Sequence, residues 1–200
     1  MKLYGSDTSP FVRKVRIVAL ASGLAEHIED VTINPYEQTD ALRAKNPLGK
    51  IPALERPEGG LVYDSRVIVQ YLLSLAEASA LLPSGAARID VLRREALADG
   101  MTDAAVAWVM ETRRPEAQRS ELWIDRWRAA ILAGADVLER EIAAWGEAMT
   151  LAHIAAGVSL GYLDFRHPDL DWRGGRPALT AWAATIHGEP AFAATRPPPA

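Results

Sequence analysis

Three short motifs in the first 65 residues place hydroxyls, an acid and prolines where backbone N–H groups are expected to be free. Ser9-Pro10 stands where a short strand gives way to a helix, Ile51-Pro52 is an X-Pro step that enters a strand, and Asp64-Ser65 opens a further helix. Helix starts present unpaired N–H groups and partial positive charge. Two such starts and one strand edge can therefore converge on a single small anionic ligand.

The position of Ser9 leaves two interpretations open. Serine is a favoured N-cap and Pro10 a favoured first helical residue, so the pair can simply start a helix. Ser9 can also donate a hydrogen bond to an anion at the helix end. If the anion is a thiolate, a hydrogen bond of about 1.5–3 kcal/mol and a helix-end contribution of about 0.3–1 kcal/mol would lower the pKa of the thiol by roughly one to three units. Thr8 offers a second hydroxyl beside it.

The other two motifs also have both a structural and a functional interpretation. Ile51-Pro52 can be a plain strand entrance, whereas a cis bond there would leave the Ile51 N–H and C=O free to pair with an extended peptide ligand. Asp64 and Ser65 can cap their helix. Alternatively, Ser65 and the helix N–H groups can hold a ligand carboxylate while Asp64 pairs with a ligand ammonium. Lys50 is either a solvated loop lysine or the partner of a second carboxylate.

Composition narrows the class of protein. The 200 residues carry a formal charge of −4 with a pI near 5.6, which argues against a nucleic-acid partner. Cysteine is absent, which excludes disulfides, thiolate metal sites and a cysteine nucleophile. The four histidines, at 27, 153, 167 and 187, lack metal-ligand spacing. The chain starts without an apolar signal region and has no apolar run near the roughly 18 residues of a membrane span. We therefore expect a soluble, cytoplasmic protein.

The hydrophobic pattern predicts an α/β domain over residues 1–77 that carries all three motifs. Its expected strands are residues 2–5, 27–33, 51–56 and 61–63. Its expected helices are residues 10–24, 41–45 and 65–77. The resulting order is βαβαββα.

Residues 78–87 are the expected linker, and only helices are predicted after it, in a second domain of residues 88–200. These helices are expected at 88–112, 119–145, 150–165 and 177–187. Residues 119–145 carry an amphipathic stripe that includes Trp123, Ile131 and Leu138. Residues 150–165 are so apolar that we expect a buried central helix.

Several runs of the chain, in this order and spacing, resemble the glutathione S-transferase family, and the resemblance covers essentially all 200 residues. The matching runs are Ser9 to Arg16, Asn46 to Leu54, and Asp64-Ser65. Ala96 to Ala104 and Gly161 to Arg166 are similar to a bacterial, serine-type, YibF-like subgroup. The resemblance implies a thioredoxin-like N-terminal domain, an all-α C-terminal domain and a homodimer with one glutathione site in each subunit and no metal.

The resemblance also implies roles for the motifs. The glutathione ligands would be Ser9, Lys50, Ile51, Pro52, Asp64 and Ser65. Ser9 would be the catalytic residue and face the sulfur, and Ile51, before a cis Pro52, would pair with the cysteinyl part of the ligand. Asp64 and Ser65 would take the γ-glutamyl end, and Lys50 the glycine carboxylate.

By the same analogy, a small hydrophobic electrophile would lie between the domains. The residues implied there are Phe11, Met101, Ala104 and Trp108. The implied activity is a glutathione transferase of the detoxifying kind. Two alternatives stay open, because a fold does not determine a function: a non-catalytic glutathione-binding module, and a glutathione-dependent peroxidase in which the ligand sulfur does the chemistry.

Two departures from the family pattern bear on this prediction. Thioltransferase-type members have a cysteine directly before the proline, where this chain has Ser9, so chemistry through a mixed disulfide is disfavoured. His153 stands where the family usually has the aspartate of a Ser/Thr-x-x-Asp capping box, after Thr150. We expect the histidine to weaken this cap, and therefore expect His153→Asp to raise the melting temperature.

Overall fold

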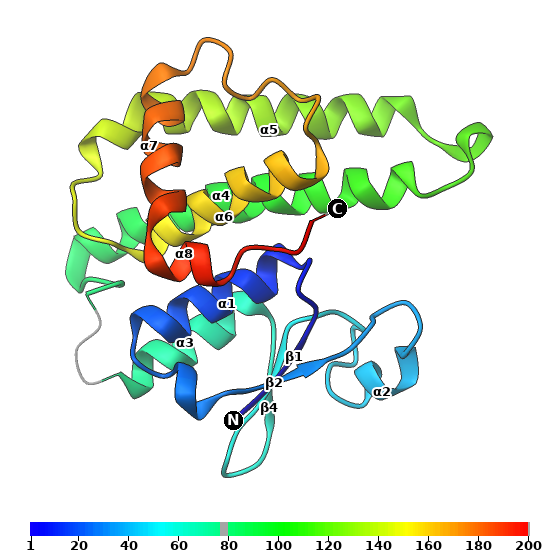
Figure 1. The fold of residues 1–200 in the computed structure, drawn as a ribbon, viewed down its shortest axis with the longest axis vertical. Helices are drawn as coiled ribbons and strands as arrows, with labels where there is room; N and C mark the ends of the chain where they lie inside the picture. The colour runs from blue at the N-terminus through cyan, green and yellow to red at the C-terminus, as the bar shows by residue number, and fades with distance from the viewer. Residues whose placement is uncertain (77–79, 200) are drawn as a thin grey trace. The chain divides into compact units, whose positions relative to one another are not determined.

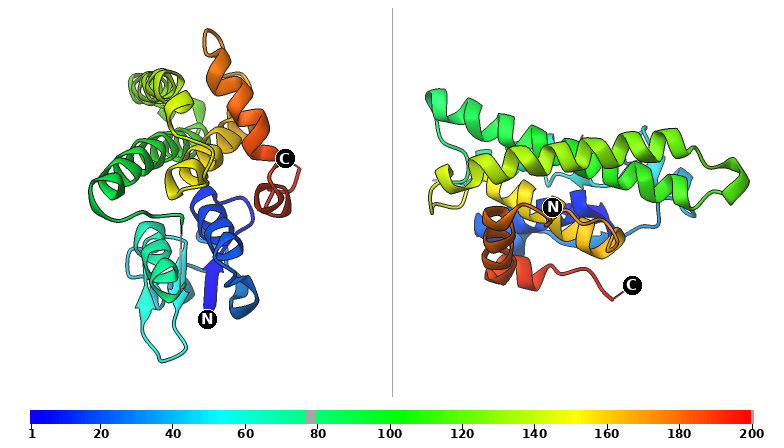
Figure 2. Two further views of the ribbon diagram at one scale, coloured as in Figure 1. Left: turned by 90° about the vertical axis from the view of Figure 1, so that its left-hand side faces the viewer. Right: turned by 90° about the horizontal axis from the view of Figure 1, so that it is seen from above.

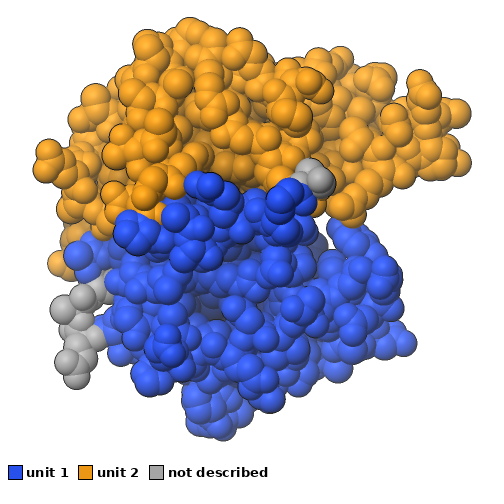
Figure 3. All heavy atoms as spheres, viewed as in Figure 1, with its two compact units in different colours: residues 1–82, 190–200 blue, residues 83–189 orange. Residues whose placement is uncertain are grey.

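The structure is a computed structural model that describes residues 1–76 and 80–199. Two compact units divide the chain, one formed by Met1–Leu82 with Pro190–Ala200 and the other by Pro83–Glu189 (Figure 3). The end of the chain, which was expected in the second domain, belongs to the first unit. The linker expected at 78–87 falls partly on residues outside the described ranges, and its last part, from Gly85, begins a helix.

The first unit combines a four-stranded mixed sheet with helices. Its elements are β1 (Lys2–Gly5), α1 (Pro10–Ala21), η1 (Ala25–His27), β2 (Glu29–Thr32), α2 (Thr39–Arg43), β3 (Ala53–Glu55), β4 (Leu61–Val62), α3 (Ser65–Leu75) and α8 (Pro190–Ala194). The strands lie in the order β2-β1-β3-β4, with β1 parallel to β2 and antiparallel to β3. The predicted order βαβαββα is confirmed.

Helices α1 and α3 carry Ser9 and Asp64 at their N-caps and lie side by side (Figure 1). Apolar residues at steps of three and four bury one face of each helix, including Val15 of α1 and Leu72 of α3. Gly5, at the end of β1, lets α1 approach closely, because a Cβ there would lie 2.6 Å from Val12 Cγ2. This packing positions the first turns of both helices.

Arg13 of α1 holds the C-terminal segment of the chain. Its Nη2 donates to the Phe192 carbonyl at 3.0 Å and its Nε donates to Thr195 Oγ1 at 3.4 Å. The Phe192 side chain is fully buried, and its ring centroid lies 5.6 Å from the guanidinium carbon. Burial, with a smaller contribution from the charge of Arg196, lowers the pKa of Arg13 to about 10. Residues at opposite ends of the sequence thus share one core.

The second unit is built from helices. They are α4 (Gly85–Thr112), η2 (Glu116–Gln118), α5 (Glu121–Glu141), η3 (Ile142–Ala144), α6 (Leu151–Arg166) and α7 (Pro177–Gly188). Helix α6 packs against α4 and α7 (Figure 2), and residues 151–160 are all buried, which confirms the predicted central helix. In the stripe of α5, Ile131 and Leu138 are fully buried. Trp123 is instead 50% exposed and stacks on Trp127.

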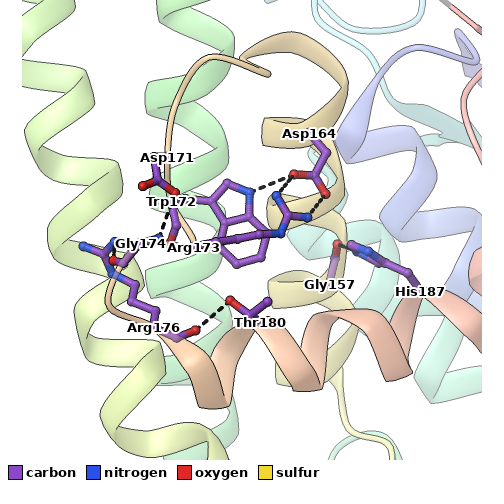
Figure 4. A network of polar contacts seen from close by, with 9 residues as sticks. All are labelled: Gly157, Asp164, Asp171, Trp172, Arg173, Gly174, Arg176, Thr180 and His187. Atoms are coloured by element: carbon purple, nitrogen blue, oxygen red, sulfur yellow. Dashed lines mark hydrogen bonds and ion pairs between the residues drawn. The ribbon is translucent and has the colours of Figure 1, made fainter.

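Asp164, near the end of α6, organises the loop that leads to α7 (Figure 4). Its Oδ1 accepts a hydrogen bond from Trp172 Nε1 at 2.8 Å, and Arg173 binds both carboxylate oxygens at 2.7 and 2.8 Å. Arg176 adds hydrogen bonds to the carbonyls of Trp172 and Gly174 at 3.2 and 3.1 Å. Asp164, in the run Gly161 to Arg166, therefore has a structural task, which is to hold the loop that connects α6 to α7.

His153 completes the N-cap of α6, so both contacts of the capping box form with a histidine in place of the usual aspartate. Its Nδ1 accepts the Thr150 N–H at 3.3 Å, which assigns the ring proton to Nε2, 3.3 Å from the Gly146 carbonyl oxygen. The buried ring packs against Trp145 and Trp182, with centroids 5.3 and 6.0 Å away. Burial lowers the pKa of His153. The neutral imidazole thus makes the backbone contact that a carboxylate would make, and also fills an aromatic core.

We now expect His153→Asp to lower the melting temperature at pH 7, through a loss of about 1–3 kcal/mol, because a charged carboxylate would be buried beside two indole rings. The stability that the depressed pKa of His153 provides is complete above the unfolded pKa of about 6.5 and decreases as the pH falls below it. A buried aspartate behaves oppositely, because burial favours its protonated form. Calorimetry should therefore show the difference between the two proteins shrinking from pH 7 to pH 5.

His27→Asp is the matched control, because the His27 side chain is exposed. Its free energy of unfolding should stay within about 0.5 kcal/mol of the wild-type value. A higher melting temperature for His153→Asp would contradict the capping role of the imidazole and restore the expectation that the histidine weakens this helix start.

Candidate ligand-binding site

Ser9 is the N-cap of α1, and its hydroxyl remains able to donate. The residue has extended backbone angles (φ −82°, ψ 122°), Pro10 follows it as the first helical residue, and Oγ accepts the Val12 N–H at 3.3 Å. This bond uses a lone pair of the oxygen and leaves the hydroxyl proton for another acceptor. The capping role and the donor role, which the sequence presented as alternatives, are therefore compatible.

Ile51 presents a free backbone edge next to the sheet. The Ile51–Pro52 peptide bond is cis, as the family resemblance implied, and a second cis bond joins Tyr63 to Asp64. Strand β3 starts at Ala53, which pairs with Tyr4 of β1. Among the described residues, neither the N–H nor the C=O of Ile51 has a hydrogen-bond partner. An unpaired donor and acceptor on one residue are what an extended peptide needs to add as a strand.

The start of α3 combines a capping acid with free N–H groups. Asp64 Oδ1 accepts the Arg66 N–H at 3.0 Å, while the rest of this exposed side chain faces solvent. Ser65, the first helical residue, is 3% exposed. One carboxylate oxygen of Asp64 is thus used by the cap and the other is available. The helix N-terminus can accommodate an anion at the same place.

The two lysines that flank the loop before Ile51 differ in their partners. Lys45 Nζ lies 2.9 Å from Glu55 Oε2, which also accepts the Tyr4 hydroxyl at 2.7 Å. Hydrogen bonding to Glu55 raises the pKa of Lys45, and hydrogen bonding from Tyr4 and Lys45 lowers the pKa of Glu55. Lys50 is exposed and makes no salt bridge to any described residue. Lys50 is therefore the lysine that can meet a ligand carboxylate.

The loop that carries Lys50 is organised by Asn46, a residue that was not among the predicted site residues. Asn46 is 1% exposed, and its Oδ1 accepts the Leu48 N–H at 3.0 Å while its Nδ2 donates to the Lys50 carbonyl at 2.8 Å. Gly49 has φ +62°, a left-handed conformation that favours glycine. An asparagine followed by proline and, three positions on, by glycine was the available signal, and it predicts a turn.

The residues predicted to meet a second substrate are distributed over both units. Phe11 lies on α1 and is partly exposed. Met101 and Ala104 are buried on α4, where Met101 fills the space beside Gly134 of α5, since a Cβ there would lie 2.6 Å from Met101 Cγ. Trp108 stacks on His167 at a centroid distance of 4.0 Å. These contacts give Met101 and Trp108 structural tasks, and the role of all four residues toward a substrate stays a prediction.

Metal-binding clusters and membrane-spanning helices are both absent from the described part of the chain. Residues 1–76 and 80–199 contain no cluster of three or more histidine, aspartate or glutamate side chains that could hold a metal ion. No described helix is both long enough and apolar enough to cross a membrane.

Comparison with known families and proteins assigns the N-terminal and the C-terminal parts of the chain to the same family. Residues 3–80 match the family "Glutathione S-transferase, N-terminal domain", and residues 121–185 match "Glutathione S-transferase, C-terminal domain". The uncharacterized GST-like protein YibF of Escherichia coli is 38% identical over 204 aligned residues, with both chains covered completely.

Several solved structures with a similar fold contain glutathione or a glutathione conjugate. A glutathione transferase family member from Pseudomonas fluorescens Pf-5 with bound glutathione is 40% identical, with 98% of each chain covered and a TM-score of 0.94. The same kind of protein from that organism was also solved with S-(propanoic acid)-glutathione, at 40% identity over 99% of this chain and all of that one, with a TM-score of 0.90. A glutathione S-transferase from Methylobacillus flagellatus KT with glutathione bound is 39% identical, covering 98% and 99% of the two chains, with a TM-score of 0.91.

Proposed function

The chain belongs to the glutathione S-transferase family, and we propose that it is a glutathione transferase that joins the glutathione thiolate to small hydrophobic electrophiles. The observation that carries the proposal is the free Ile51 edge in the same unit as two capped helix starts, at Ser9 and Asp64. Relatives about 40% identical to this chain bind glutathione and a glutathione S-conjugate.

In the proposed complex each end of the tripeptide has a chemically matched partner. The free oxygen of Asp64 pairs with the γ-glutamyl ammonium, and Ser65 with the N-terminal N–H groups of α3 holds the adjacent carboxylate. The Ile51 N–H and C=O pair with the cysteinyl backbone. Lys50 neutralises the glycine carboxylate, and the Ser9 hydroxyl donates to the sulfur.

The proposed reaction needs the ligand sulfur as a thiolate and no nucleophile from the protein, which has no cysteine. The thiol proton passes to water when the thiolate forms. The Ser9 hydroxyl stabilises the negative charge and stays protonated, since it acts as a donor. The thiolate then uses a lone pair to form a C–S bond with the electrophilic carbon. In a substitution the leaving group departs with its bonding pair, and in an addition the resulting carbanion takes a proton from water.

Assays on the wild-type protein distinguish the transferase from the two alternatives, a glutathione-dependent peroxidase and a non-catalytic glutathione-binding module. Calorimetry measures the affinity for glutathione, and conjugation is followed with a generic aryl halide and peroxidation with an organic hydroperoxide. Binding with conjugation supports the transferase, and turnover of the hydroperoxide alone supports the peroxidase. Binding without either activity supports the non-catalytic module, and absence of binding contradicts the whole proposal.

We also propose that the protein acts in the cytoplasm and as a homodimer. Apolar side chains are exposed on one face of α3 and on the edge strand β4, namely Val67 (51%), Leu75 (46%) and Leu61 (37%). Exposed apolar patches of this kind are typical of protein interfaces.

Sedimentation equilibrium is expected to give twice the 21.8 kDa mass of one chain. Val67→Glu should yield a monomer, because the new charge would be buried at the interface. Leu20→Glu, at a residue that is 40% exposed on α1, is the control and should leave the dimer intact. A monomeric wild type would contradict the proposal.

A further inference from the structure

Two turns of the first unit share the sequence Asn-Pro and can be compared directly. Asn34 Oδ1 accepts the Tyr36 N–H at 3.0 Å, and Asn46 Oδ1 accepts the Leu48 N–H at 3.0 Å. In both turns the asparagine therefore holds the backbone two residues on, which is the ordinary task of asparagine in a turn.

The two asparagines differ in burial and in what the amide nitrogen does. Asn46 is 1% exposed and Asn34 is partly exposed. Only Asn46 extends its contact further along the chain, with Nδ2 donating to the Lys50 carbonyl at 2.8 Å. The backbone is held in both turns, since the Asn46 N–H donates to the Leu42 carbonyl of α2 at 2.7 Å and the Asn34 N–H donates to Gln38 Oε1 at 2.8 Å. Asn46 is thus a buried fixed point inside the loop.

The contact with Lys50 determines where the next N–H points. The Lys50 carbonyl and the Ile51 N–H belong to one planar peptide group, and in a trans peptide these two groups point in opposite directions. When Asn46 binds the carbonyl on the buried side, the Ile51 N–H is directed away from Asn46. This N–H has no partner among the described residues. The hydrogen bond to the carbonyl also polarises the peptide, which strengthens the N–H as a donor.

We propose that Asn46 is a positioning residue that orients the Lys50–Ile51 peptide for hydrogen bonding to an extended thiol peptide. The inference rests on the proposed function for the identity of the ligand. Asn46 itself does not touch the ligand, and acts through the peptide group that does. Asn46 thereby connects helix α2, through its backbone N–H, to the peptide group whose N–H the ligand would use, through its side chain.

Asn46→Asp tests this role with nearly unchanged shape. Aspartate keeps an oxygen for the Leu48 N–H but replaces the donor to Lys50 with a second acceptor, so the Lys50 carbonyl loses its partner. We expect the dissociation constant and the KM for glutathione to rise about tenfold or more. The kcat at saturating glutathione should stay within about threefold, because Ser9 is unaffected. Relaxation measurements should give a lower order parameter for the Ile51 amide even without ligand, because the peptide is no longer held in one orientation.

Asn34→Asp is the matched control, since it makes the same chemical change in the other turn. It should leave the affinity for glutathione within about twofold of wild type. If Asn46→Asp does not fold, Asn46→Ser and Asn34→Ser replace the pair, because the serine hydroxyl can still cap the turn but is too short to reach the Lys50 carbonyl.

The outcomes separate the inference from the proposed function. Equal glutathione affinity in the Asn46 and Asn34 variants, or a loss of melting temperature without a change in KM, overturns the positioning role. A wild-type protein that does not bind glutathione overturns the proposed function. In that case the order parameter of the Ile51 amide still decides on Asn46, with an unchanged value in the variant counting against the positioning role.

Discussion

Replacing Ser9 with glycine is expected to lower kcat/KM for conjugation by about 10- to 100-fold and to raise the pKa of the bound glutathione thiol by roughly one to two units. Both effects follow from the loss of a charge-assisted hydrogen bond of about 1.5–3 kcal/mol to the thiolate. Glycine is preferable to alanine at this position. Ser9 also caps α1 through Val12, and glycine costs only a few tenths of a kcal/mol at an N-cap, against about 1 kcal/mol for alanine. The thiolate absorbance of the bound ligand, titrated against pH, measures the pKa directly.

Thr8→Ala is the control for Ser9 and also decides between the two hydroxyls. If Ser9 is the donor, Thr8→Ala should keep both the thiol pKa and kcat/KM near their wild-type values. If instead Thr8 contacts the sulfur, the two variants should exchange their effects. Turnover that neither substitution changes would leave the serine with its capping role alone, while the family assignment would stand.

The double variant Asp64→Ala/Ser65→Ala is expected to abolish measurable binding of glutathione. Two charge-assisted contacts to the γ-glutamyl end, each of about 1.5–3 kcal/mol, correspond to a loss of affinity on the order of 10²- to 10⁴-fold. The double variant also affects the helix itself, because Asp64 Oδ1 caps α3 by accepting the Arg66 N–H. The experiment therefore combines calorimetry for binding with a melting curve for stability.

Asp64→Asn separates the two tasks of this acid. The amide oxygen can still accept the Arg66 N–H, so the melting temperature should change little. The negative charge for the ligand ammonium is lost, and the affinity for glutathione should fall about tenfold or more. Affinity near the wild-type value in the double variant would contradict the assignment of the γ-glutamyl end to α3.

The sequence predicted the scaffold of the site because that scaffold is locally encoded. Ser9-Pro10 and Asp64-Ser65 do start helices, and the succession of strands and helices along the first unit follows from short apolar runs and turns. The buried helix α6 was predictable for the same reason, since its apolar character lies within its own residues. Patterns that involve only residues three or four positions apart predict a helix or strand without information on the rest of the chain.

The errors and omissions share a different cause. His153 was expected to weaken a cap, but whether an imidazole can replace a carboxylate depends on Trp145 and Trp182, which pack around it from other segments. The C-terminal segment was expected in the helical domain, yet it packs on α1 through Arg13, 179 residues away from Phe192. Periodicity within a segment contains no information on such partners.

What the sequence by itself determined is therefore the chemistry available at each motif: two helix starts, an X-Pro step before a strand, a lysine, and no cysteine. The tertiary structure alone decided how these groups are oriented. The free edge at Ile51 and the buried amide of Asn46 behind it depend on how a loop closes against α2 and the sheet. The burial of a single polar side chain in a loop, and the direction of the hydrogen bonds that it makes, depend on distant segments that exclude water together, and for this reason no local pattern of residues predicts them.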